Sequence, residues 1–200
     1  MSHGLSMSAL GPFSADIRRL LGSGRNFVLL FALLFATVAI GAAAGFALDP
    51  DMRQTVIEEF EAAVPDNDSG YVTTFRDLFI HNFLIGLGIL GAGLWLRYLP
   101  PSILAFNGLA IGLILCCYAE GSPAGTLMAF AMCMPHGVFE LTSLVAVTCL
   151  ALHVNSWKRS APPAGLGPDD LRWVGRCVWY VAIFDLVAAA IEAGLIAVLR

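Results

Sequence analysis

The chain has 200 residues, of which 58% are hydrophobic and only 13% are charged, and its mean hydropathy is +0.78. A soluble domain covers its core with charged residues, so this composition argues against a soluble enzyme, and nothing in it indicates nucleic-acid binding. Most of the acidic residues behind the net charge of −4 lie in one stretch, and the five cysteines lie in apolar segments without CxxC spacing. The apolar residues fall in long blocks, which predicts an all-α bundle in a lipid bilayer.

The N-terminal half of the chain predicts three membrane helices. A segment with several arginines, residues 1–25, precedes the first helix over residues 26–48, which carry no charge. At about 1.5 Å per residue, such a helix crosses a hydrocarbon core of about 30 Å. An acidic loop over residues 49–77 follows, and residues 55–64 within it have the apolar spacing of a short amphipathic helix. Helices over residues 78–98 and 102–118 then form a hairpin, because two prolines leave room only for a tight turn.

The next apolar run, residues 126–154, contains Pro135 and Gly137. Proline removes one backbone hydrogen bond and glycine loosens the turn beside it, so we do not expect a single straight helix. We predict a short re-entrant or interfacial segment, Thr126–Met134, and then a fourth membrane helix over residues 136–154. A turn-rich connection leads to a fifth helix over residues 177–199. The expected fold is one polytopic bundle of about five membrane helices, residues 26–200.

The basic residues predict the orientation of the bundle, since cytoplasmic flanks of membrane helices carry an excess of lysine and arginine. A cytoplasmic N-terminus places most of the basic residues inside: Arg18, Arg19, Arg25, Arg97, Lys158, Arg159, Arg172 and Arg176. Only Arg53, Arg76 and Arg200 are then outside. We therefore expect a protein of the bacterial cytoplasmic (inner) membrane with its acidic loop and its C-terminus outside.

Small residues indicate how the helices touch, because in lipid close backbone approach takes over from the hydrophobic effect. Gly41 and Gly45 form one GxxxG spacing, and Gly108 and Gly112 form another. Packing within the bundle is the favoured interpretation. A homodimer through a glycine-rich helix face is the alternative.

Several polar residues fall where lipid is expected. Each ionisable side chain there costs about 2.5 to 3.5 kcal/mol on insertion scales, so such residues usually face a bundle interior. The predicted intramembrane polar site comprises His81, Asn82, Asn107, His136, Glu140, Asp185 and Glu192. His136 and Glu140 are four residues apart, and Asp185 and Glu192 are seven apart, so each pair shares one helix face. The predicted orientation puts four of these residues in the outer half of the membrane, where we expect them to converge: His81, His136, Glu140 and Glu192.

Three explanations for this convergence stay open. The first is structural, with side chains bonding across helices to fix the packing. The second is a proton or solute path past Glu140 and Asp185, with His81 and His136 as relays. The third is a metal centre that suits Zn²⁺ or a similar ion, with the candidate ligands His81, His136, Glu140 and Glu192. No GxSxG, HExxH or P-loop pattern is present, which favours a non-enzymatic role, and no cofactor is identified.

Three sequence elements carry a resemblance to a known family. The string MPHGVFELTSL, Met134–Leu144, resembles the PHGxxE signature of the stage II sporulation protein M family. FNGLAIG, Phe106–Gly112, resembles that family's asparagine-glycine helix, and HNFLIGLGILGAG, His81–Gly93, is similar to the glycine-rich helix before it. Where the family pattern has a pair of asparagines, this chain has His81 and Asn82. The residues that the resemblance implies to matter are Asn82, Asn107, Pro135, His136, Gly137 and Glu140.

The resemblance implies a polytopic protein of the cytoplasmic membrane. In spore formers the namesake works with peptidoglycan-degrading partners and supplies membrane anchoring, not hydrolysis, and relatives occur in organisms that make no spores. The leading hypothesis is therefore a membrane scaffold or assembly factor for cell-envelope remodelling, with envelope or peptidoglycan-modifying proteins as partners. A small transporter or channel is the second hypothesis. An intramembrane metal-dependent hydrolase is the third.

Overall fold

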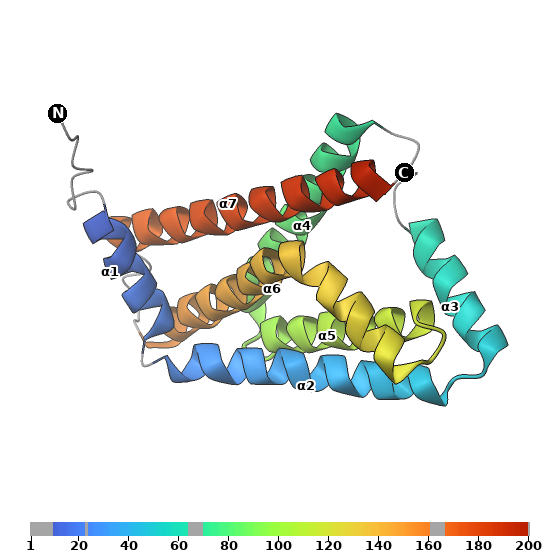
Figure 1. Ribbon diagram of the computed structural model, residues 1–200. Coiled ribbons are helices and arrows are strands. Elements are labelled where there is room, and N and C mark those ends of the chain that lie inside the picture. Colours follow the sequence, from blue (N-terminus) through green and yellow to red (C-terminus); the bar gives the residue numbers. More distant parts are fainter. Residues whose placement is uncertain (1–9, 23, 64–69, 161–166, 200) are drawn as a thin grey trace.

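The computed structural model describes residues 10–22, 24–63, 70–160 and 167–199, and within these ranges it contains helices and no strands (Figure 1). In chain order the helices are α1 (Leu10–Leu21), α2 (Arg25–Ala47), α3 (Pro50–Ala63), α4 (Tyr71–Trp95), α5 (Leu99–Tyr118), α6 (Pro123–Ser160) and α7 (Pro168–Leu199). Five of them, α2 and α4 to α7, are long and apolar enough to cross a membrane. The predicted all-α class with five spans is confirmed.

Some of the predicted segments fall in part outside the described residues. These are residues 1–9 and Ser23 of the N-terminal segment, residues 64–69 of the acidic loop, residues 161–166 of the connection before α7, and Arg200. The rest of the acidic loop is mostly helical, because it holds α3 and the first turns of α4. The amphipathic helix expected over residues 55–64 corresponds to α3, which begins five residues earlier, at Pro50.

Several helices extend beyond the predicted membrane spans. The second span was predicted over residues 78–98, but α4 begins at Tyr71. Charge limits the part of a helix that lies in lipid, whereas the helix itself can continue into water. Arg76 illustrates this, since its Nε donates to the Asp77 carboxylate at 2.8 Å on the exposed surface of α4. The last helix likewise begins at Pro168, where proline suits the first helical position and Asp169 and Asp170 suit the first turn.

Helix α6 differs from the prediction, because it runs without interruption through Pro135. The separate re-entrant or interfacial segment expected over Thr126–Met134 is the N-terminal part of this same helix. A proline inside a helix removes one hydrogen bond, and the usual result is a kink. The ribbon agrees, since α6 changes direction between its yellow N-terminal part and its orange C-terminal part (Figure 1).

The GxxxG pairs lie in the interface between α2 and α5. A Cβ atom at Gly41 would collide with the backbone oxygen of Leu109, and one at Gly112 would collide with the backbone oxygen of Val38. Gly108 lies in the same way against the Thr37 hydroxyl. The space beside both glycine pairs is therefore occupied by contacts between α2 and α5 of the same chain, which was the favoured interpretation. By contrast, nothing lies within 4 Å of a Cβ built at Gly88 or Gly91 of α4.

The C-terminal half of α6 forms the centre of the bundle. Its Val145, Thr148, Leu150 and Ala151 are fully enclosed, and α6 contacts α1, α2, α4, α5 and α7. Helix α4 approaches α6 closely at Gly93, whose carbonyl accepts a 2.6 Å hydrogen bond from the Asn155 side chain. The bend in α6 therefore adjoins the half of the helix that is most enclosed by the neighbouring helices.

Helices α1 and α3 lie at opposite ends of the bundle (Figure 1). The Asp49 carboxylate caps the start of α3 by accepting from the Met52 backbone N–H at 2.9 Å. Arg53 then donates to three carbonyl oxygens at the ends of α2 and α5: Gly45 at 3.1 Å, Phe46 at 3.2 Å and Glu120 at 2.8 Å. Carbonyls at the C-terminal end of a helix lack the regular i+4 backbone donor and carry partial negative charge, although the Gly45 oxygen also accepts from the Leu48 backbone N–H at 3.3 Å. Arg53 therefore fixes α3 to that end of the bundle.

Candidate functional site

Three of the predicted site residues meet between α6 and α7. His136 and Glu140 lie on one face of α6 and Glu192 lies on α7, and each offers a ligand atom within 4.8 Å of the other two. The i, i+4 spacing aligns the first two residues, and the packing of α6 against α7 brings in the third. All three side chains are half-buried. The expected convergence is thus found for these residues, which we call the His-Glu-Glu cluster.

Most polar atoms of the His-Glu-Glu cluster form no hydrogen bond with a described residue. The His136 Nδ1 atom is buried and has no hydrogen-bond partner. Within the described ranges, no hydrogen bond or ion pair joins the Glu140 or Glu192 carboxylate to another residue. Buried polar groups in proteins are nearly always bonded, and buried charges are paired or bind a metal. The cluster therefore has unused capacity to bind a ligand.

His81 and Asp185 lie outside the cluster itself. His81 of α4 is exposed, but it is close enough to interact electrostatically with Glu192, as His136 also does. Asp185 is only 2% exposed, and its carboxylate accepts from the Ser143 hydroxyl while the Oδ2 atom has no partner. It precedes Glu192 by two helical turns on α7. The structure thus places His81 at the edge of the cluster and Asp185 deeper in the bundle.

The remaining predicted residues do not join the cluster. The Asn107 amide donates to the Ile103 carbonyl of its own helix at 2.9 Å, so its polarity is satisfied locally. Asn82 is half-buried on α4 and has no hydrogen bond to a described residue. Pro135 is exposed, and no atom lies within 4 Å of a Cβ built at Gly137. Pro135 and Gly137 therefore act through the shape of α6, whereas Gly108 acts through the packing of α5 on α2.

Cys133 belongs to the surroundings of the cluster, although sequence reasoning treated it only as a small apolar residue. Its thiol interacts electrostatically with both Glu140 and Glu192. The signal was present in the sequence, because Cys133, His136 and Glu140 follow the i, i+3, i+7 spacing of one helix face. One imidazole, two carboxylates and a nearby thiol are groups that can bind a divalent cation or exchange protons.

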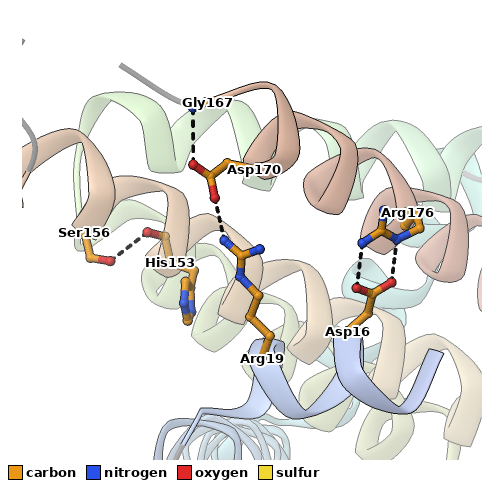
Figure 2. A network of polar contacts seen from close by, with 7 residues as sticks. All are labelled: Asp16, Arg19, His153, Ser156, Gly167, Asp170 and Arg176. Atoms are coloured by element: carbon orange, nitrogen blue, oxygen red, sulfur yellow. Dashed lines mark hydrogen bonds and ion pairs between the residues drawn. The ribbon is translucent and has the colours of Figure 1, made fainter. Parts of the chain in front are cut away.

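A second polar network, at the end of the bundle that holds α1, was not predicted (Figure 2). Asp16 of α1 is 5% exposed and accepts two hydrogen bonds from Arg176 of α7, at 2.6 and 2.8 Å. The Tyr180 hydroxyl also donates to Asp16, at 3.1 Å. The hydrogen bond from the Arg176 guanidinium holds the pKa of Asp16 below its usual value. This network fastens α1 to α7.

Arg19 extends the same network to α6. Its guanidinium pairs with Asp170, as Figure 2 shows, and its central carbon lies 4.5 Å from the Trp173 ring centre and 4.9 Å from that of Trp157. Asp170 also accepts from the Gly167 backbone N–H at 3.2 Å, which caps α7. The charged groups of this network, Asp16, Arg19, Asp170 and Arg176, are all paired, so we interpret the network as structural, in contrast to the open His-Glu-Glu cluster.

The comparison with protein families places the whole bundle in one of them. Residues 27–195 match the family described as Stage II sporulation protein M. This range covers most of the chain, including all five apolar helices for most of their length and every residue of the His-Glu-Glu cluster. No curated protein and no solved structure matches the chain. The chain therefore belongs to the stage II sporulation protein M family.

Proposed function

We propose that this protein is a scaffold or assembly factor for cell-envelope remodelling in the bacterial cytoplasmic membrane. The support is its membership of the stage II sporulation protein M family together with five apolar helices. A membrane protein of this kind holds partners in place and needs an ordered surface outside the lipid. In this chain the candidate for that surface is α3.

The proposed orientation has the N-terminus in the cytoplasm and the C-terminus outside. The basic residues support it, because α1 and the first turns of α7 contain Arg18, Arg19, Arg172 and Arg176 at one end of the bundle. Helix α3 lies at the opposite end (Figure 1) and would face the exterior. Under this orientation the acidic surface meets envelope proteins and not cytoplasmic ones.

The observation that carries the proposal is the way in which α3 is held. Arg53 ties its first turn to the ends of α2 and α5, while Glu58 and Glu59 are exposed. Binding to an ordered helix avoids the entropy that a partner would lose by ordering a flexible loop. An exposed acidic helix also favours partners with basic surfaces, since complementary charge speeds encounter and selects among proteins.

Photo-crosslinking in native membranes tests this proposal. A photoreactive residue at Glu58 or Glu59 should capture peptidoglycan-modifying or other envelope proteins, and Arg53→Ala should reduce that capture. Phe106 is the matched control, because it is 71% exposed on the apolar helix α5, where lipid is expected. Recovery of the same proteins from all three positions, or of no envelope protein from α3, would contradict the scaffold.

A second function, movement of a proton or small cation through the bundle, is favoured by one observation. Asp185 is enclosed and the Glu140 and Glu192 carboxylates have no partner among the described residues, so titratable groups follow one another along α6 and α7. Flux into proteoliposomes should then fall for Glu140→Gln. Identical flux for the variant and the wild type would remove this residue from any path.

A homodimer through a glycine-rich helix face stays a prediction. Because the GxxxG glycines of α2 and α5 are filled within the chain, Gly88 and Gly91 of α4 are the glycines in that helix with open space beside them. Gly175 and Gly194 of α7 also have open space, but they are far apart along their helix, so we favour α4 for a dimer interface of this kind.

A further inference from the structure

We propose that His136, Glu140 and Glu192 bind one divalent transition-metal ion between α6 and α7. This goes beyond the scaffold function, which needs no metal. The ion would be held by one imidazole nitrogen and two carboxylate oxygens, a set that suits Zn²⁺ and related first-row ions. Four lines of observation lead to this site.

The first is geometry. A tetrahedral zinc ion with bonds of about 2.1 Å places its ligand atoms about 3.4 Å apart. The three donor atoms of the cluster all lie within 4.8 Å of one another without an ion between them. The donor atoms would therefore have to move together by about 1.4 Å at most, a distance that changes in side-chain torsion angles can cover. Two ligands on adjacent turns of α6 and one on α7 also give the ion a role in joining the helices.

The second is charge. Two carboxylates in the apolar part of a bundle are costly unless a cation compensates them. No lysine or arginine of the described residues forms an ion pair with Glu140 or Glu192, since the ion pairs formed are those of Arg19, Arg76, Arg172 and Arg176 with aspartates elsewhere. One divalent ion with two carboxylates and a neutral imidazole gives a net charge of zero. The ion would therefore remove the electrostatic cost of the cluster.

The third observation is that the cluster lacks the hydrogen bonds that a purely structural role would require. If the cluster only fixed the packing of α6 on α7, its members should hydrogen-bond to one another across the helices. Within the described ranges neither carboxylate forms such a bond, and the buried His136 Nδ1 has no partner. By contrast, the buried carboxylate of the structural network at the other end of the bundle is bonded, with Asp16 accepting from both Arg176 and Tyr180.

The fourth is the presence of further donors. His81 and Cys133 both interact electrostatically with Glu192, so an imidazole and a thiol lie in the neighbourhood of the proposed ion. Three protein ligands leave at least one coordination position, which water or one of these side chains would fill. Asp185 is not assigned as a ligand, because it lies two turns away on α7.

Metal binding by the full chain in detergent tests the proposal. After treatment with EDTA, the protein is dialysed against Zn²⁺ and its bound metal is measured by elemental analysis. We expect about one equivalent for the wild type, and a loss of affinity of at least about tenfold for His136→Gln or Glu192→Gln. Asp185→Asn and Glu58→Gln are matched controls for a buried and an exposed carboxylate, and both should keep about one equivalent.

Two further measurements distinguish the loss of a metal ligand from a variant that fails to fold. Added Zn²⁺ should raise the unfolding temperature of the wild type but not that of Glu192→Gln, because a ligand stabilises only the state that binds it. X-ray absorption of the Zn²⁺-loaded wild type should show a first shell dominated by nitrogen and oxygen. Binding below about a tenth of an equivalent, or equal binding by the variants and the controls, would overturn the site.

Discussion

Asp16 and Arg176 are 160 positions apart in the chain, yet the Arg176 guanidinium donates to both oxygens of the Asp16 carboxylate, at 2.6 and 2.8 Å. The pair joins the first described helix to the last. Two parallel charge-assisted hydrogen bonds of this kind are among the strongest polar contacts in proteins. Because the Asp16 side chain is almost fully enclosed, water competes weakly for its oxygens.

Asp16→Asn should therefore destabilise the protein. The amide cannot accept both hydrogen bonds, and the expected loss is about 1 to 3 kcal/mol in the free energy of unfolding. Asp169→Asn is the matched control, because the Asp169–Arg172 pair is 94% and 74% exposed at its two side chains and should contribute at most about 0.5 kcal/mol. Thermal unfolding in detergent measures both. Equal losses in the two variants would contradict the importance of the enclosed pair.

The same pair predicts a pH dependence. The Arg176 hydrogen bond lowers the pKa of Asp16 below its ordinary value of 3.8. A carboxyl whose pKa is lower in the folded state stabilises the fold fully above its unfolded pKa, and this contribution is lost as the pH falls through the folded pKa. The difference in unfolding temperature between the wild type and Asp16→Asn should thus be constant near pH 6 to 7 and narrow below about pH 4. A difference that widens in acid would have the wrong sign.

This pair also shows which contacts the sequence alone does not reveal. Membrane spans were predictable because lipid requires long apolar runs, and the cluster of His136, Glu140 and Glu192 was predictable because helical periodicity and topology together place their side chains. Nothing local links Asp16 to Arg176, since they become neighbours only after α1 folds back across the end of the bundle. Long-range pairs of this kind depend on tertiary packing, and the spacing of residues along a helix does not reveal it.

Local geometry at Asn107 and Pro135 is equally hard to predict from the sequence. Asn107 resembled a site residue because it is polar inside an apolar run, but an asparagine can satisfy its amide on the Ile103 carbonyl one turn back. Pro135 indicated an interruption, but the surrounding helix is long enough to continue through it as a bend. Both residues change local geometry, and the sequence pattern does not distinguish a bend from a break.

Arg19 should report on the packing of α1 against the two tryptophans. Arg19→Ala removes the cation beside Trp157 and Trp173, so the tryptophan fluorescence should change, with a loss of about 1 to 2 kcal/mol in the free energy of unfolding. Arg19→Lys keeps the charge but loses the planar group, and should be intermediate. Arg18→Ala is the control, because among the described residues the Arg18 side chain bonds to Ser14 of α1 and does not contact the two tryptophan rings. A spectrum of Arg19→Ala that matches Arg18→Ala would contradict the stacking.

Arg53 should control the order of α3. Arg53→Ala removes the guanidinium donors from three carbonyl oxygens near the ends of α2 and α5, and Arg53→Lys cannot reach all three with one ammonium group. Hydrogen exchange of the α3 backbone should become about tenfold faster or more in both variants, because the anchor of its first turn is lost. Gln54→Ala is the control, since Gln54 bonds only to the exposed Glu58. Unchanged exchange in Arg53→Ala would mean that other contacts hold α3.

Substitution of glycine by alanine should distinguish packed glycines from open ones by the sign of the change in the free energy of unfolding. At Gly112 a methyl group would collide with the Val38 backbone oxygen, which cannot move aside without shifting α2, so Gly112→Ala should destabilise the protein by about 1 to 3 kcal/mol. At Gly88 nothing lies within 4 Å of the new Cβ, so Gly88→Ala should be neutral or should stabilise α4 by up to about 1 kcal/mol through helix propensity. Unfolding measured in mixed detergent micelles gives both values. If Gly88→Ala instead destabilised the protein as much as Gly112→Ala, the open face of α4 would have to be in contact with a second molecule, and the change in its self-association would then identify the homodimer.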